Sequence, residues 1–267
     1  MAKKAVAVKE EAGLPADLLA EMEADAGAGQ ADITASDVDI SRLRILQQMS
    51  PQCVRSKGEY IEGAQAGQIF NTVTGELWDQ DNGPIIVPCS YGFKYVVWAD
   101  RQSKTQDGSK APQAVYTRTD EQAGRLPSTT RDDRNREITE EGHILTPTSE
   151  FYVLIVNEET GTFENAIISC SSTQLTPAKK WNALIKQQIQ QTAEGPKPAA
   201  IFSRSYKTRT IDRSNDQGDW AVWEFSLNGP LQNLGIYRAS KAFAAAIDSG
   251  KVEANYSQPD EIHDNVM

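Results

Sequence analysis

The sequence predicts an α+β protein with a mainly antiparallel β core, two late helices and disordered acidic ends. Short runs of alternating apolar residues are spread from residue 68 to residue 227, which favours strands. Apolar residues at helical spacing follow late in the chain, and the first 40 residues contain no aromatic side chain. With 267 residues, 39% of them hydrophobic, the chain is long enough to bury a core.

Paired strand patterns predict most of the core. Thr74-Gly75 joins two short strands as a hairpin, and a second hairpin turns at Gly161. The expected strands are Gln68–Val73, Glu76–Trp78, Ile85–Val87, Tyr91–Trp98, Phe151–Val156, Phe163–Ser169, Ala199–Arg209 and Trp220–Leu227. The core is therefore expected to be a sheet built largely from neighbouring antiparallel strands.

Two late segments have the pattern of helices. Thr176–Gln191 repeats apolar residues at helical spacing after Pro177, and glycine and two prolines at 195–198 are expected to stop it. A closing helix is expected to begin at Leu231 or Tyr237 and to end at Ile247. The polar stretch 99–143 has few residues to bury and predicts a long loop.

The charge distribution divides the chain into three parts. Residues 1–39 form an expected acidic disordered arm with a short helix over Pro15–Met22, residues 40–247 a single β-rich core domain, and residues 248–267 an acidic tail. Three lysines and nine acidic residues give the first 40 positions a charge of −6, and one lysine and five acidic residues give the last 20 a charge of −4. The core between them is neutral, so the net charge of −10 belongs to the ends.

Cysteine use and hydropathy bear on localisation. Cys53, Cys89 and Cys170 are an odd, scattered set, which favours reduced thiols. No apolar run of membrane-spanning length and no signal-peptide pattern is visible. We therefore expect an intracellular protein without a membrane partner.

Motifs that support catalysis are missing, and we expect neither an enzyme nor a cofactor. The isolated cysteines and the two histidines, His143 and His263, lack metal-ligand spacing, and no phosphate-binding glycine motif or nucleophile elbow occurs. The carboxylates of residues 132–141 leave a divalent-metal nuclease as a weak alternative, since we expect them in a solvated loop.

Single-stranded nucleic acid binding needs only cations that follow phosphates and flat rings that stack on bases. Lys179–Arg213 holds eight basic and two acidic residues, the strongest positive run in the chain. Alternation places Phe202, Arg204 and Tyr206 on one strand face, and the same reasoning groups the rings of another strand. The candidate contacts are Lys179, Lys180, Lys186, Phe202, Arg204, Tyr206, Lys207, Arg209, Tyr91, Phe93 and Tyr95. Core packing explains the ring alternation equally well.

Several segments resemble a family of bacteriophage early proteins described as single-stranded DNA-binding proteins. They are SRLRILQQMSPQ, YIEGAQAGQIFNTVTGELW, VPCSYGFKYVVW and STQLTPAKKWNALI, within about Ser41 to Ile185. The resemblance implies a replication, recombination or transcription accessory that coats single-stranded DNA in the host cytoplasm, on an OB-like barrel or sheet. The short tail ends Asn265-Val266-Met267 and lacks the terminal aromatic residue common in phage proteins of this role.

Two functions follow from these observations. The first is non-catalytic binding of single-stranded DNA, with a polymerase or other replication and transcription proteins as further partners of the acidic ends, and with self-association into a homo-oligomer. The alternative is a phage interaction or virion-associated protein that docks to protein partners such as RNA polymerase.

Overall fold

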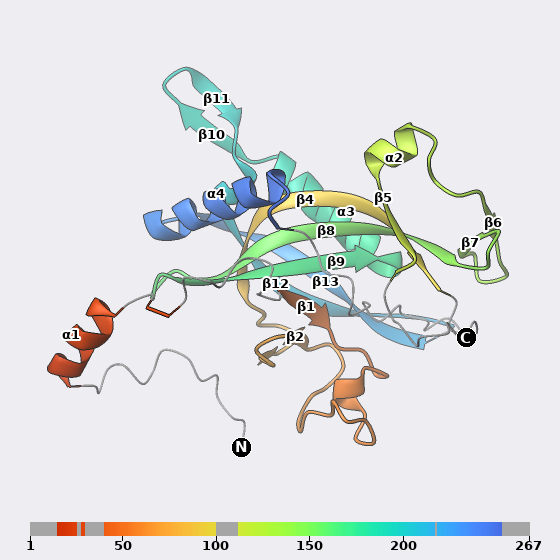
Figure 1. Ribbon diagram of the computed structural model, residues 1–267, viewed down its shortest axis with the longest axis horizontal. Helices are drawn as coiled ribbons and strands as arrows, with labels where there is room; N and C mark the ends of the chain where they lie inside the picture. The colour runs from red at the N-terminus through yellow and green to blue at the C-terminus, as the bar shows by residue number, and fades with distance from the viewer. Residues whose placement is uncertain (1–14, 26–27, 30–39, 100–111, 217, 253–267) are drawn as a thin grey trace. The chain divides into compact units, whose positions relative to one another are not determined.

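The computed structural model describes residues 15–25, 28–29, 40–99, 112–216 and 218–252 (Figure 1). The chain divides into two units, Met1–Asp39 and Ile40–Met267. The described part of the first unit contains helix α1 (Ala16–Ala24), where a short helix was expected. The expected disorder of the ends concerns residues that lie mostly outside the described ranges.

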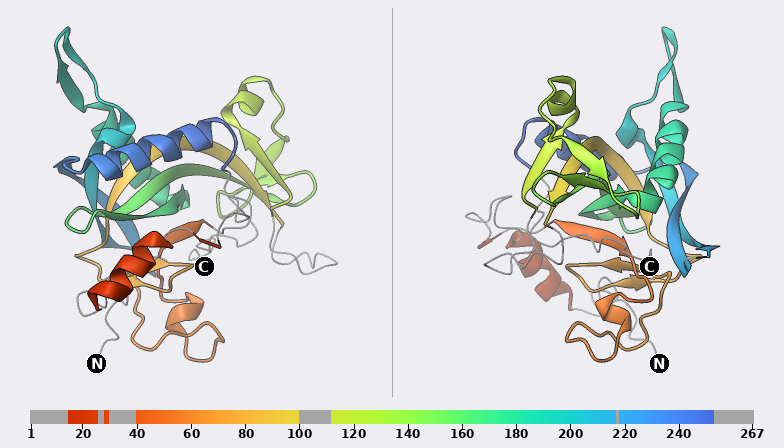
Figure 2. Two further views of the ribbon diagram at one scale, coloured as in Figure 1. Left: turned by 60° about the vertical axis from the view of Figure 1, so that its left-hand side comes forward. Right: turned by 90° about the vertical axis from the view of Figure 1, so that its right-hand side faces the viewer.

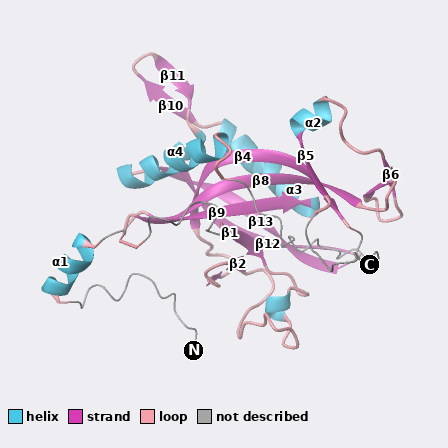
Figure 3. Cartoon of the chain, viewed as in Figure 1, coloured by secondary structure: helices cyan, strands magenta, loops and turns pink. Residues whose placement is uncertain are grey.

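The second unit contains strands and helices in a mixed order (Figure 3). Its strands are β1 (Ser41–Ile45), β2 (Ile69–Asn71), β3 (Leu77–Trp78), β4 (Ile85–Trp98), β5 (Ala114–Thr117), β6 (Thr129–Arg131), β7 (Glu137–Thr139), β8 (Ile144–Asn157), β9 (Thr162–Ser171), β10 (Ile189–Thr192), β11 (Gly195–Pro198), β12 (Arg204–Asn215) and β13 (Gly218–Pro230). Its helices are α2 (Arg118–Gln122), α3 (Leu175–Lys186) and α4 (Leu234–Asp248), with short 3-10 turns at Pro51–Cys53, Ser172–Gln174 and Ile201–Ser203.

Eleven of these strands form one curled sheet in the order β13-β12-β4-β8-β9-β1-β2-β3, with β5 added to β4 and with β6 and β7 extending from β8. All pairings are antiparallel except that between β1 and β9. The predicted α+β class with a mainly antiparallel core is thus confirmed. The curl is that of a half-barrel, compatible with the expected OB-like form (Figure 2).

Buried side-chain amides complete the edge of β13. The Gln47 amide donates to the carbonyl oxygen of Ala221 and accepts from its N–H, each at 3.0 Å. Gln174 donates to the same carbonyl at 2.9 Å and accepts from the N–H of Trp223 at 3.0 Å. The two glutamines therefore replace a neighbouring strand at this edge, where unpaired backbone groups would otherwise be buried.

Both faces of the sheet are covered. Alternation along β8 sends Phe151 and Val153 into the core that contains Trp181 of α3, and Tyr152 and Leu154 into a second core that contains residues of α4. Figure 2 shows α3 and α4 against different faces of the curled sheet. We call the face toward Trp181 the inner face and the face toward α4 the outer face.

A bulge in β4 changes which side chains face inward. The register against β8 shifts between Pro88 and Ser90. Ile86 and Tyr91, five positions apart, consequently contribute to the same inner core, whereas Val87 and Cys89 lie in the outer core. The bulge therefore directs Tyr91 and the alternating rings after it to the inner face.

Two predicted segments were wrong in part. Helix α3 ends at Lys186, five residues before the predicted end, and residues 189–198 form the hairpin β10–β11. Side chains of β10 are exposed, so no burial favours a longer helix there. The stretch 99–143 is also no single loop, because its described part, from residue 112, contains β5, α2, β6 and β7. None of the helices in the described ranges has the length and apolar content needed to span a bilayer.

Candidate nucleic-acid interface

The rings of β4 occupy different environments along the inner face. Tyr91 packs against the inner core, with its ring centroid 4.9 Å from that of buried Phe151. Phe93 and Tyr95 follow it toward the end of the strand, and both are half-buried. Their centroids are 5.3 Å apart at an interplanar angle of 80°. Only these two of the three predicted β4 rings lie together outside the core.

An arginine covers one of these rings. The guanidinium carbon of Arg118 lies 4.3 Å from the centroid of Phe93, within the range of a cation–π contact. Tyr116 of β5 is the cross-strand partner of Tyr95 and is also half-buried. We call Phe93, Tyr95, Tyr116 and Arg118 the β4 ring cluster.

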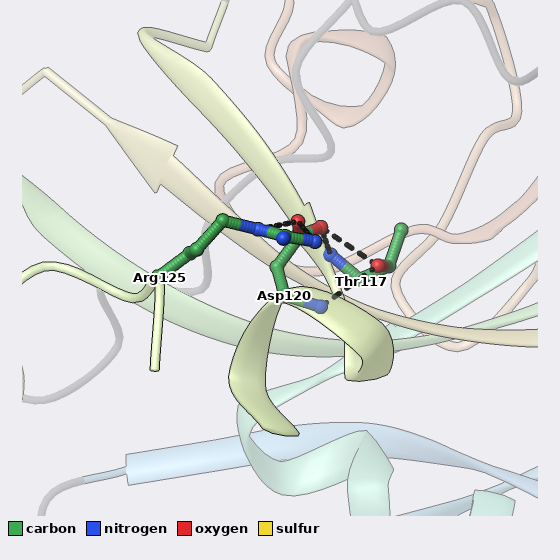
Figure 4. A network of polar contacts seen from close by, with 3 residues as sticks. All are labelled: Thr117, Asp120 and Arg125. Carbon is green, nitrogen blue, oxygen red and sulfur yellow. Dashed lines mark hydrogen bonds and ion pairs between the residues drawn. The ribbon is translucent and has the colours of Figure 1, made fainter. Parts of the chain in front are cut away.

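Helix α2 positions the arginine of this cluster. Thr117 caps the helix, because its hydroxyl accepts from the Asp120 N–H while the Asp120 carboxylate accepts from the Thr117 N–H at 2.7 Å (Figure 4). Arg125 donates to the same carboxylate through Nε at 2.8 Å. Hydrogen bonds from the Thr117 side chain and backbone, then from Arg125, lower the pKa of Asp120 to about 2. Arg118 is the first residue of the helix that this network holds.

An acidic residue of α2 also reaches the cluster. Partial burial raises the pKa of Tyr95 to about 12, with a further contribution from its hydrogen bond to Glu121 and from the negative charge of that carboxylate. The tyrosine hydroxyl is therefore protonated at neutral pH and serves as a donor. The surroundings of the rings thus contain one cation, Arg118, and one carboxylate, Glu121, to which the Tyr95 hydroxyl is hydrogen-bonded.

Of the predicted pair of rings in the basic segment, Tyr206 is wrong as a stacking ring because it is buried, whereas Phe202 is half-buried. Tyr206 is 1% exposed and packs edge-on against Trp181, with centroids 5.8 Å apart. Burial raises its pKa to about 12. Phe202 lies in a 3-10 turn before β12 and contacts Tyr237 at 5.7 Å. A register shift between Ser205 and Tyr206 further removes the simple alternation on which the prediction depended.

Arg204 has a structural environment as well. Its guanidinium donates to the carbonyl of Ile189 and to the side chain of Gln190, both at 3.3 Å. It also donates to the carbonyl of Ser203 at 3.1 Å. The residue therefore links the start of β12 to the base of the β10–β11 hairpin, and it does not lie between two stacking rings.

The remaining predicted cations are exposed but distributed over two elements. Lys179, Lys180 and Lys186 lie on α3, and Lys207 lies on β12. Arg209 of β12 forms an ion pair with Glu224 of β13. Within the described ranges the four lysines have no ion-pair partner, whereas Arg209 is neutralised.

The carboxylates considered for a nuclease are engaged in the chain itself. Asp132 accepts from the backbone of Arg134 and Arg136 and from the Arg136 guanidinium at 2.7 Å. Across the described residues, no group of three or more histidine, cysteine or acidic side chains is placed to hold a metal ion. No observed cluster supports the nuclease alternative.

Sequence reasoning missed Tyr116 and Arg118 because it treated residues 99–143 as a loop. A signal was present, since Val115, Tyr116 and Thr117 are residue types that favour strands and Thr117-x-x-Asp120 has the spacing of a capping box. These patterns together predict a short strand that enters a helix. Their proximity to β4 could not be inferred without the register that places Tyr116 opposite Tyr95.

The fold and the cluster define a curled antiparallel β protein with an aromatic surface site covered by an arginine. The chain belongs to the family described as Pam3 phage gp34-like protein, whose model matches residues 9–253. The match confirms the expected association with bacteriophages. Comparisons with curated proteins and with solved structures found no match.

Proposed function

We propose that this phage-associated protein binds single-stranded DNA without catalysing a reaction, and that the β4 ring cluster is the stacking site. The observation that carries the proposal is the placement of Arg118 over Phe93 beside Tyr95, with all three rings of the cluster partly open to solvent. Unstacked bases bind to such rings with little regard to sequence, because every base has a flat π face.

A small number of base-stacking contacts is expected to contribute much of the binding free energy. A base that stacks on an exposed aromatic side chain contributes about 1–3 kcal/mol. Arg118 lies against Phe93 at 4.3 Å, so a base reaches that face of the ring only when the arginine moves to stack on the far side of the base or to bind a phosphate. Its guanidinium keeps its charge in either position. The hydroxyl of Tyr95 donates its one hydrogen to Glu121, so it can contact a base only as an acceptor, for example from an amino group.

Electrostatics add a contribution that does not depend on base identity. Lys179, Lys180, Lys186 and Lys207 are exposed and have no ion-pair partner within the described ranges. Each phosphate neutralised by such a cation is expected to change the slope of log K against log salt by about 0.7 for a single strand. Residues 41–247 carry no net charge, so the net charge of −10 does not come from the part of the chain that carries these lysines.

The proposal is tested by fluorescence anisotropy of a labelled oligo-dT with Phe93→Ala and Arg118→Ala proteins. Loss of one stack predicts an affinity lower by about tenfold or more for Phe93→Ala. Phe163→Ala is the matched control, since Phe163 is 50% exposed on β9 and belongs to neither core. Arg118 is exposed, so its substitution separates lost binding from lost folding.

Equal affinities for the wild type and both cluster variants would remove the cluster from the binding site. Absence of any salt-sensitive oligonucleotide binding by the wild type would overturn the proposed function itself. Co-purification with protein partners that survives nuclease treatment, together with that absence, would favour the protein-docking alternative.

A further inference from the structure

The hairpin β10–β11 projects from the body of the second unit as a separate two-stranded sheet (Figures 1 and 2). Its register pairs Ile189 with Pro198, Gln190 with Lys197, Gln191 with Pro196 and Thr192 with Gly195. The N–H of Ala199 donates to the carbonyl of Gln188, so hydrogen-bonded pairs alternate with non-hydrogen-bonded ones from that point. The backbone groups of Ile189 and Gln191 on β10, and of Pro196 and Pro198 on β11, therefore point away from the hairpin.

The outer edge of β11 is closed to further strands. Both outward positions on this strand are proline, which has no N–H to donate. The prolines cost the hairpin no internal hydrogen bond, because their nitrogens face outward. Proline at this position is a recognised means of blocking an edge.

The outer edge of β10 is open. Within the described ranges the N–H groups of Ile189 and Gln191 have no hydrogen-bond partner. Among the residues that the structure describes, the carbonyl of Ile189 accepts only from Arg204, and that of Gln191 only from the side chain of Gln190, each at 3.3 Å. A carbonyl oxygen has two lone pairs, so both can accept a second bond. The strand carries no charge along this edge and has no proline.

We propose that the open edge of β10 pairs with β10 of a second copy of this chain, antiparallel and about a twofold axis. Centred on Gln190, this arrangement places Ile189 opposite Gln191 of the other copy, and the reverse. Each of the two pairs then exchanges two hydrogen bonds, which satisfies the free N–H groups of both copies at once.

The asymmetry between the two edges explains why a second copy is the expected occupant. A strand that pairs with itself about a twofold axis uses the same surface on both partners, and the assembly closes as a dimer. If both edges were open, the same chemistry would permit continued addition and fibres. The prolines of β11 stop that growth after one pairing.

The contact is small, so the dimer is expected to be weak in free solution and to strengthen when two copies are held close together. Binding of neighbouring copies to one strand of DNA would supply that proximity and make binding cooperative. The inference about pairing does not depend on the proposed function, because it is tested without nucleic acid.

Disulfide trapping tests the geometry directly, in a Cys53→Ser background that removes the one native cysteine that is not buried. In the proposed dimer the two Gln190 Cα atoms form a non-hydrogen-bonded pair about 4.5 Å apart, within the range for a disulfide. Lys197, the hairpin partner of Gln190, is the matched control. Two Lys197 residues would be separated by three strand spacings, about 14 Å.

Under mild oxidation Gln190→Cys protein should form covalent dimers about tenfold faster than Lys197→Cys protein at equal concentration. Adding Gln191→Pro removes one outward N–H and leaves the bonds inside the hairpin intact, so it should reduce trapping of Gln190→Cys to the rate of the control. Equal rates for the two cysteine variants, or trapping that persists with Gln191→Pro, would overturn the proposed pairing, whatever the outcome of the DNA-binding test.

Discussion

The buried amides of Gln47 and Gln174 should contribute to stability in a way that two substitutions can separate. Gln174→Leu keeps the approximate side-chain volume but leaves the N–H of Trp223 without its acceptor, while the carbonyl of Ala221 still accepts from Gln47. Gln47→Leu leaves the N–H of Ala221 without a partner and spares that carbonyl. Each single change should lower the free energy of unfolding by about 1–3 kcal/mol, the cost of one unsatisfied buried group.

The double variant should lose more than the sum of the two single losses. Only when both amides are absent does the carbonyl of Ala221 lose all its partners, which adds a further cost of about 1–3 kcal/mol. Urea unfolding followed by circular dichroism measures all four proteins of the cycle. Gln122→Leu on the exposed surface of α2 is the control, with an expected change within about 0.5 kcal/mol. Additive losses, or single losses as small as that of the control, would refute the idea that the glutamines complete the sheet edge.

Three further predictions concern packing, ionisation and thiol reactivity. Gly83→Ala should destabilise the fold by about 1–3 kcal/mol in a thermal melt, because a Cβ there would lie 2.7 Å from the carbonyl oxygen of Thr208; an unchanged melting temperature would show that the segment moves freely. Asp120 has a lowered pKa, so its contribution to α2 should be complete above pH 3.8 and be lost as pH falls through about 2, as followed by NMR titration of its carboxyl; a midpoint near 3.8 would contradict the hydrogen-bond network. Burial raises the pKa of the Cys89 thiol to about 12, so a thiol reagent at pH 8 should modify Cys53 first, and rapid loss of the Cys89 thiol in native protein would show that the outer core is open.

The class of fold could be predicted because strand patterns are local. The hairpin around Gly161 is present with Gly161 at a positive φ of 74°, and alternation along β8 separates the inner from the outer core. These features depend on neighbouring residues and on the period of two. A sequence pattern carries them without knowledge of the tertiary structure.

The site was predicted less well, because alternation groups side chains on a face without showing which face is open to solvent. Tyr206 and Phe93 have similar aromatic surroundings in the sequence, but α3 covers the first with Trp181 and leaves the second half-buried. The bulge near Cys89 also reverses which alternate side chains of β4 point to the inner core. Only a proline marks this point in the sequence. Trp181, which buries Tyr206, lies 25 residues before it on a separate helix, and such packing cannot be read from a local strand pattern.

Long-range polar contacts were the least predictable part. Gln47 and Ala221 are 174 residues apart in the sequence, and nothing in either segment indicates that an amide will complete a distant strand edge. Arg204 shows the same difficulty. An arginine in a basic run is as compatible with phosphate binding as with hydrogen bonding to the backbone of a neighbouring hairpin. Only the geometry distinguishes these roles.

The central claim is most directly tested by titrating labelled single-stranded and duplex oligonucleotides of equal length with the wild-type protein at two salt concentrations. The label belongs on the DNA, because Trp98, Trp181 and Trp223 are buried and report poorly on a surface contact. The account predicts tighter binding to the single strand, a loss of affinity with salt, and a stacking contribution at Phe93 that persists at high salt. Equal and weak binding to both oligonucleotides, unaffected by salt, would contradict it.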